Sequence, residues 1–254
     1  MNIPFKDNKR LEAVVKLVNE NEELTALFEA CNGMAVKRLG MTDHGLVHSF
    51  IVANIALKLL RNLVASGVTP SIVKDFDFSN DDAEVVVVLA SLMHDAGNAV
   101  HRDLHDNFGV LLVKDFLEQI LSKVYGPREK IIMITEIMSA MVSHSEEIKV
   151  FTLEGGIVRL ADGLDMEKGR ARIAFELGER SIHSVSAMSI DKVSINSGKK
   201  PIMIEISMNN SAGIFQVDYL LKKKLKGSGL ERYTEIKAIV SQNEEKIVTE
   251  YKME

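Results

Sequence analysis

Two kinds of hydrophobic pattern divide the chain. From about residue 9 to about residue 180, apolar residues mostly recur three and four positions apart, the spacing of one helix face. Beyond residue 189 the interval becomes two, as in PIMIEISM at residues 201–208, where every second residue is Ile or Met. The sequence therefore predicts an α+β fold, in which a mainly all-α domain precedes a smaller part rich in strands.

Start and stop residues divide the first part into separate helices. Ser79 or Asn80 can cap the helix that follows them, and Pro127 suits a first helical turn. Gly97 suits the end of the helix that carries His94. These signals favour several packed helices over one long helix.

The second part contains four segments of alternating pattern: SIDKVSIN, PIMIEISM, EIKAIVSQ and EKIVTEYK. Residues 197–199 and 242–244 suit the turns of two hairpins, and residues 213–226 between the pairs read as a helix. We therefore expect a β-β-α-β-β module over residues 183–254, after a helical domain over residues 1–182. Its strands need a partner for their apolar face, which favours a homo-oligomer, such as a homodimer, or a lid over the helical domain.

Composition narrows the class of protein. A net charge of −5 disfavours a stable nucleic-acid partner, because such proteins usually carry excess Lys and Arg. The single cysteine, Cys31, excludes an intrachain disulfide. Neither a signal peptide nor an apolar run of membrane-spanning length is found. We expect a cytoplasmic protein with no membrane partner.

The histidines are concentrated where chemistry is expected. Six of the seven lie between His44 and His144, in the helical part. His94 and Asp95 end the apolar run Val86–Met93, where an unpaired carboxylate would carry a desolvation cost on the order of several kcal/mol. An ion pair, a helix cap or a bound metal would each offset that cost.

Three motifs resemble those of the HD-domain phosphohydrolases. They read H-S-x-x-V-A from His48, M-H-D-x-G-N over Met93–Asn98 and R-L-A-D-x-L-D over Arg159–Asp165, in that family's order. The resemblance covers roughly residues 40 to 170. It implies an HD-type helical domain and hydrolysis of a phosphate ester by metal-activated water. It also implies one divalent cation, such as Mn, Fe, Co, Ni, Zn or Mg, bound by His48, His94, Asp95 and Asp162.

A second cation is the next expectation from the resemblance. His101 and His105 are spaced as neighbours on one helix turn, and His144 follows a helical pattern near its end. Some relatives supply histidines in these regions, which implies a second ion on His105 and His144 with Asp95 as the bridge. Hydrogen-bonded histidines at the mouth of the site are the alternative.

Charged residues beside the motifs add candidates for catalysis. Arg102 and Lys168 could neutralise a substrate phosphate, and Asp165 could assist proton transfer. Each has a simpler alternative, a solvated surface charge for the two cations and helix-stabilising pairing with Lys168 for Asp165. His44 is expected to line the cleft or cap a helix. The basic run 222–226 is expected to be the solvated end of a helix.

The leading hypothesis is a metal-dependent phosphohydrolase acting on a small phosphate ester, nucleotide-like, as a monoester or a diester. Alternatives are a phosphodiesterase acting on RNA or cyclic nucleotides and a non-catalytic regulator that binds a metal or a nucleotide. An oxygenase is a further alternative, because some dinuclear iron relatives oxidise their substrates.

Overall fold

The structure is a computed structural model that describes residues 2–170 and 182–241. The longer helices are α1 Lys9–Asn19, α2 Glu22–Asn32, α3 Leu46–Ala65, α5 Asn80–Met93, α6 His105–Leu121, α7 Pro127–Val142 and α8 Leu153–Leu164. Shorter ones are α4 Ser71–Phe76, α10 Ile182–Met188 and α11 Lys222–Leu225, and the strands are β1 Ile190–Asn196, β2 Ile202–Met208 and β3 Thr234–Val240. The α+β class predicted from the sequence is confirmed.

Helix starts follow the local sequence. Ser79 caps α5 with a reciprocal capping box to Asp82, and Pro127 occupies the first turn of α7. Gly97 has a different role from the one expected. It lies in the 3-10 helix Ala96–Ala99, and a Cβ there would lie 1.9 Å from the backbone oxygen of His105. A side chain is excluded because α6 crosses the backbone at this point.

The core is built on α3, α5 and α8. Most of α5 is buried, including the run Val85–Met93, and it packs against both other helices. Among the described helices, α3 alone has the length and apolar composition of a membrane span, but 56% of its most apolar window is buried inside the protein. Packing in the core accounts for its apolar face.

The strands form a sheet of order β1-β2-β3. The hairpin predicted for β1 and β2 is present, with Ile195 opposite Ile204, whereas β3 runs parallel to β2 with Ile236 opposite Ile204. The helix expected at 213–226 is present as the π-helix Gln216–Leu221 and α11, and it makes the crossover that a parallel pair requires. The fourth strand and its turn at 242–244 lie outside the described residues.

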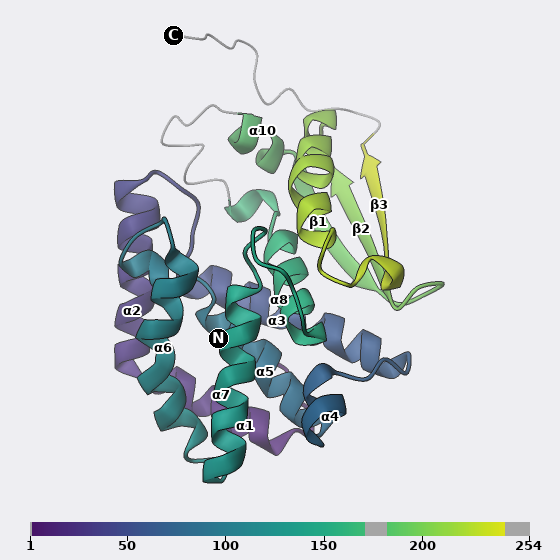
Figure 1. Cartoon of the computed structure of the whole chain (residues 1–254). Helices are drawn as coiled ribbons and strands as arrows, with labels where there is room; N and C mark the ends of the chain where they lie inside the picture. The colour runs from purple at the N-terminus through teal and green to yellow at the C-terminus, as the bar shows by residue number, and fades with distance from the viewer. Residues whose placement is uncertain (1, 171–181, 242–254) are drawn as a thin grey trace.

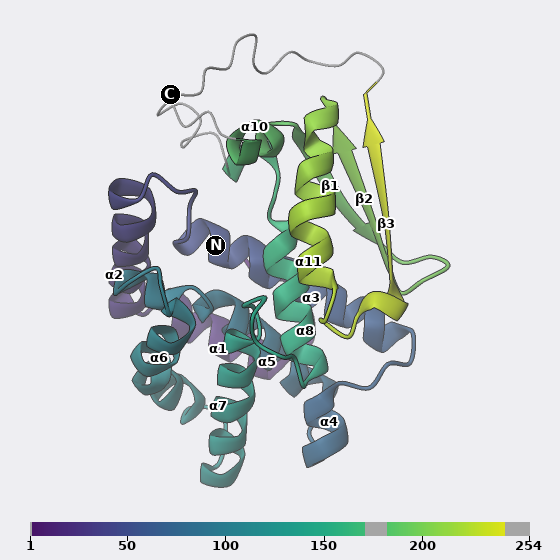
Figure 2. The same cartoon turned by 45° about the horizontal axis from the view of Figure 1, so that its top comes forward.

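Helix α8 lies on the side of the helical part that meets the C-terminal segment (Figures 1 and 2), and α3 contacts β1 and β2 directly. It packs against α3, α5 and α7, and also against α11 and the π-helix Gln216–Leu221. Ile157 on α8 and Ile206 on β2 belong to one continuous hydrophobic core. The two kinds of secondary structure therefore share a core, and α8 brings residues of both together.

Candidate metal centre

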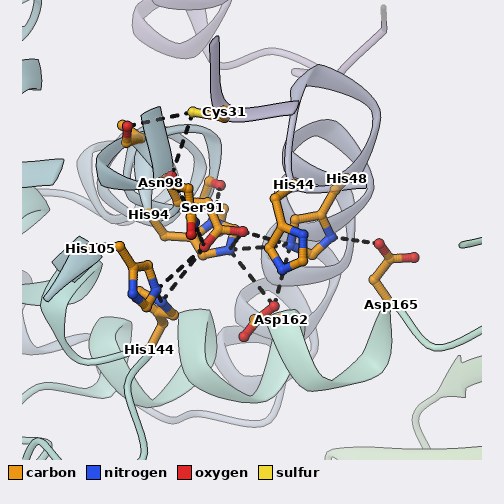
Figure 3. A network of polar contacts seen from close by, with 12 residues as sticks. Cys31, His44, His48, Ser91, His94, Asn98, His105, His144, Asp162 and Asp165 are labelled. Atoms are coloured by element: carbon orange, nitrogen blue, oxygen red, sulfur yellow. Dashed lines mark hydrogen bonds and ion pairs between the residues drawn. The ribbon is translucent and has the colours of Figure 1, made fainter. Parts of the chain in front are cut away.

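Three core helices bring four of the predicted ligands together. His48 lies in the first turn of α3, His94 and Asp95 directly follow α5, and Asp162 lies in the last turn of α8. His48 Nε2 lies 3.3 Å from His94 Nε2, 3.4 Å from Asp95 Oδ2 and 3.3 Å from Asp162 Oδ1 (Figure 3). We call these four residues the first cluster.

The spacing of these atoms fits a metal ion. His94 Nε2 lies 3.2 Å from Asp95 Oδ2 and 3.7 Å from Asp162 Oδ1. Donors about 2.0–2.2 Å from a shared ion are separated by about 2.8–3.6 Å in octahedral or tetrahedral geometry. Two imidazoles and two carboxylates are also borderline-hard ligands that suit a divalent transition metal. The first cluster therefore has the chemistry and nearly the dimensions of a ligand set.

Hydrogen bonds fix the imidazoles so that each Nε2 points inward. His48 Nδ1 lies 2.6 Å from Asp165 Oδ2, and His94 Nδ1 lies 2.7 Å from the carbonyl oxygen of Ser91. The start of α3 is held by Asp43, whose Oδ1 accepts from the backbone N–H of His48 at 3.2 Å. Such partners on the outer nitrogen set the tautomer that presents Nε2 to a metal.

Asn98 and Cys31 contact the segment that carries Asp95. Asn98 Nδ2 donates to Asp95 Oδ1 at 2.9 Å. Cys31 lies against the same segment, with Sγ 3.6 Å from the carbonyl oxygen of Asp95 and 3.5 Å from that of Ala96. Burial raises the pKa of the Cys31 thiol to about 12, so it stays protonated and donates. The lone cysteine has a supporting position here.

A second cluster, His105, Asp106 and His144, lies beside the first. The two Nε2 atoms are 3.1 Å apart, and Asp106 Oδ1 lies 3.4 Å from that of His105 and 3.2 Å from that of His144. Asp95 Oδ1 lies 3.6 Å and 4.0 Å from the same two nitrogens, while Asp95 Oδ2 faces the first cluster. Asp95 is thus placed between two groups of donors.

Sequence reasoning missed Asp106. Its Oδ1 is buried and makes no hydrogen bond within the described part of the chain. A buried carboxylate oxygen without a donor is costly, so its position beside two imidazoles suits a cation. The available signal was its place directly after His105 at the start of α6.

The charges of the first cluster balance one another. Burial alone would lower the pKa of both imidazoles, but the neighbouring carboxylates outweigh it and raise the pKa of His48 to about 9 and that of His94 to about 10. Despite burial, nearby positive charge holds the pKa of Asp95 and of Asp162 well below the usual range. Protons on the imidazoles thus occupy the place that a cation would take.

The second cluster is different. Burial lowers the pKa of His105, and burial together with the charges of His94 and Lys224 holds the pKa of His144 well below its usual value. Both imidazoles are therefore neutral near pH 7, the form that binds a metal.

A cavity of about 710 Å³ opens onto both clusters. His44 lines it, as expected, with Nδ1 2.7 Å from the carbonyl oxygen of Thr42, and burial lowers the pKa of His44 to about 4. Three cationic side chains of the wall are Arg102, Arg170 and Lys224.

The structure separates the remaining candidates. Arg102 lines the cavity, where its Nη1 donates to Asn98 Oδ1 at 3.0 Å. Lys168 does not line it; its half-exposed side chain lies 2.7 Å from Asp191 Oδ1. Asp165 is buried, holds an imidazole of the first cluster and also lies at the cavity.

The expectation that His101 and His105 share a helix turn is wrong. Helix α6 begins at His105, and the preceding Leu104 has a left-handed φ of 61°. His101 consequently lies in the turn before the helix, with a side chain 61% exposed. One residue in an unusual backbone conformation is enough to break the helical spacing.

The expectation that the whole basic run at 222–226 is solvated is also wrong. Lys224 Nζ donates to Asp162 Oδ2 at 2.9 Å and to the carbonyl oxygen of His144 at 2.8 Å. Composition gave no sign of this contact, because the neighbouring Lys222 and Lys223 are exposed.

Comparison with known proteins is consistent with this geometry. The family model described as HD domain matches residues 45–167, which include every donor of both clusters. An uncharacterized protein of Methanocaldococcus jannaschii is 42% identical over 241 residues, which are 93% of this chain and 93% of that protein. No solved structure matches the chain.

Proposed function

The chain belongs to the HD-domain superfamily, and we propose that it is a metal-dependent hydrolase of a small phosphate ester. One observation carries this proposal: His48, His94, Asp95 and Asp162 converge from three core helices, and Asp95 and Asp162 line a cavity. Core packing alone does not account for four largely buried polar side chains next to a cavity, whereas a binding site does.

The proposed metal ligands follow from the two clusters. His48, His94, Asp95 and Asp162 would hold one divalent ion. His105, His144 and the second oxygen of Asp95 would hold another, with Asp106 as an additional carboxylate. The short contacts around Asp95 support a shared ligand, because its two oxygens face different clusters.

Divalent ions held there would supply an acidified water and polarise a phosphoryl oxygen. The chain itself would position the groups. Asp165 holds Nδ1 of His48, so Nε2 is kept toward the centre. Arg102, Arg170 and Lys224 place positive charge around the cavity, which favours a phosphate dianion over a neutral ester.

The cavity favours a small substrate over a polymer. Its volume, about 710 Å³, lies in the ordinary range for small-molecule sites. Glu146 and Glu147 line it as well, and two carboxylates would repel the continuous phosphates of RNA. We therefore place a nucleotide-sized monoester or diester ahead of RNA.

Elemental analysis and a substrate screen test the proposal together. Freshly purified protein should contain up to two divalent ions per chain and hydrolyse at least one nucleotide, cyclic nucleotide or general phosphatase substrate with added Mn, Co, Ni or Mg. A chelator should remove this activity, and metal should restore it. Undiminished hydrolysis by metal-free protein would refute the proposal, whereas resident iron with oxygen consumption would favour an oxygenase.

We also propose that the protein is a homo-oligomer in the cytoplasm. The apolar side of β2 already packs within the shared core, so an interface would use another surface. Light scattering on the purified protein would measure the mass directly, and a mass of one chain at high concentration would contradict the proposal.

A further inference from the structure

Lys224 is directed inward from a run of lysines that otherwise faces solvent. Its side chain is 17% exposed, against 70% for that of Lys222, which pairs with Asp218 at 2.7 Å. Lys223 lies over the ring of Tyr219 at 3.7 Å. Of these three lysines, Lys224 alone reaches the candidate metal centre.

Two glycines of α8 make room for the segment that carries Lys224. A Cβ on Gly163 would lie 3.0 Å from Cγ and 3.1 Å from Cβ of Lys224. A Cβ on Gly156 would lie 2.1 Å from the backbone oxygen of Ser228, just after α11. The stem of Lys224 therefore rests on bare helix backbone, which fixes the direction of its ammonium group.

The contacts of this ammonium leave one hydrogen for a ligand. Two of its three hydrogens go to Asp162 Oδ2 and to the carbonyl oxygen of His144. The third has no acceptor among the described residues, and Lys224 lines the cavity. The other oxygen of Asp162 faces His48 at 3.3 Å, so Lys224 stands at the border between the donors and the open space.

We propose that Lys224 binds a phosphate oxygen of the substrate with this remaining hydrogen, and that the C-terminal module thereby supplies part of the active site. The identity of the ligand as a phosphate rests on the proposed function. Arg102 donates to Asn98, and Arg170 donates to the carbonyl oxygen of Asp165 and lies 3.4 Å from His48 Nε2; their remaining N–H groups would assist Lys224. An ammonium beside Asp162 gives charge-assisted recognition of an oxyanion.

Titration of inorganic phosphate into metal-loaded protein tests the contact. Lys224→Met keeps the stem and removes the charge, so phosphate should bind about 10- to 100-fold more weakly, as expected for one charged hydrogen bond. Metal content, measured on the same samples, should stay at the parent value. Lys222→Met, changed two residues away on the exposed side, should bind phosphate like the parent, and Lys224→Arg should recover part of the affinity.

Two results for the Lys224→Met variant would overturn the inference. One is that the variant binds phosphate as tightly as the parent. The other is that the variant loses bound metal to the same extent as phosphate binding, because Lys224 would then only position Asp162. Parent protein that binds no phosphate would also overturn it. Calorimetry reads phosphate binding without turnover, so failure of the proposed hydrolysis would be seen separately in the substrate screen.

Discussion

The two donor clusters contain the same kinds of side chain but differ in charge. In the first, His48 lies against three carboxylates and His94 against two, and the pKa values rise to about 9 for His48 and about 10 for His94. In the second, burial dominates, and the pKa values of His105 and His144 fall. Similar residues thus give one cluster that holds protons and another whose imidazoles are already free to bind a cation. Carboxylates that hydrogen-bond to the rings raise the pKa values in the first cluster, whereas burial and nearby positive charges, of Arg102 at His105 and of His94 and Lys224 at His144, lower them in the second.

Asp95 joins the clusters, so its removal should have the largest effect. Asp95→Ala would take away one carboxylate oxygen from each cluster. Loss of a hydrogen-bond partner of a metal ligand costs up to about 100-fold in activity, so loss of the ligand itself should lower hydrolysis by more than that. Bound metal should fall to less than one ion per chain. Activity assays and elemental analysis measure both. Asp103→Ala is the control, because that side chain is 87% exposed; activity above a tenth of the parent in Asp95→Ala would contradict the shared position.

A double variant separates the clusters. His105→Ala with His144→Ala removes both imidazoles of the second cluster and leaves the first intact. Saturated protein should then retain one ion instead of two, and hydrolysis should fall with the lost ion. His101→Ala provides the control, because that histidine is exposed. A metal content of two in the double variant would show that these residues only line the cavity.

The pKa difference predicts different proton release from the two clusters. At pH 7 the first cluster carries protons on His48 and His94, because their pKa values lie near 9 and 10. Metal uptake there should release two protons, and its affinity should rise by up to about 100-fold per pH unit until about pH 9. The second cluster should release none, since its imidazoles have lowered pKa values and are neutral.

Calorimetry in buffers of different ionisation enthalpy counts these protons. The double variant that lacks His105 and His144 isolates the first cluster for the same measurement. Equal proton release from both binding steps of the parent would contradict the assigned charge states.

The smallest of these effects concerns the support of one imidazole. Asp165→Asn would weaken the contact that holds His48 Nδ1 at 2.6 Å. Metal affinity at the first cluster should fall by about 10- to 100-fold, while the second cluster keeps its ion. Competition with a coloured chelator would measure each step, and Asp191→Asn, on the surface next to Lys168, is a matched control. Equal weakening of both steps would show that the change acts on the fold instead.

The first cluster was expected from the three motifs that resemble the HD-domain phosphohydrolases, and its members also lie beside apolar runs at helix ends. His48, His94 and Asp162 meet where the core helices α3, α5 and α8 pack together. His101 was misplaced because the left-handed conformation of Leu104 interrupts the helix, and no strong propensity marks that residue. The spacing of residues along the chain does not predict the backbone conformation of a single position.

Long-range contacts were harder to predict than helices. The hairpin of β1 and β2 was predicted from alternation, but the parallel pairing of β3 depends on how the intervening helix crosses the sheet. The role of Lys224 could not be predicted, because nothing local separates it from Lys222 and Lys223. Lys224 differs from its neighbours through a long-range contact: its aliphatic stem packs against Gly163 on α8, some sixty positions earlier, where the absence of a side chain leaves room for it.

The fit between Gly163 and Lys224 has a consequence for how such proteins diverge. A methyl group at 163 would press on the lysine stem, and a shorter or branched residue at 224 would leave the slot on α8 unfilled. Either substitution alone should be disfavoured, so lineages are expected to change the two positions together. A C-terminal module exchanged between distant relatives should therefore support activity only when its residue at 224 fits the residue at 163 of the recipient helix.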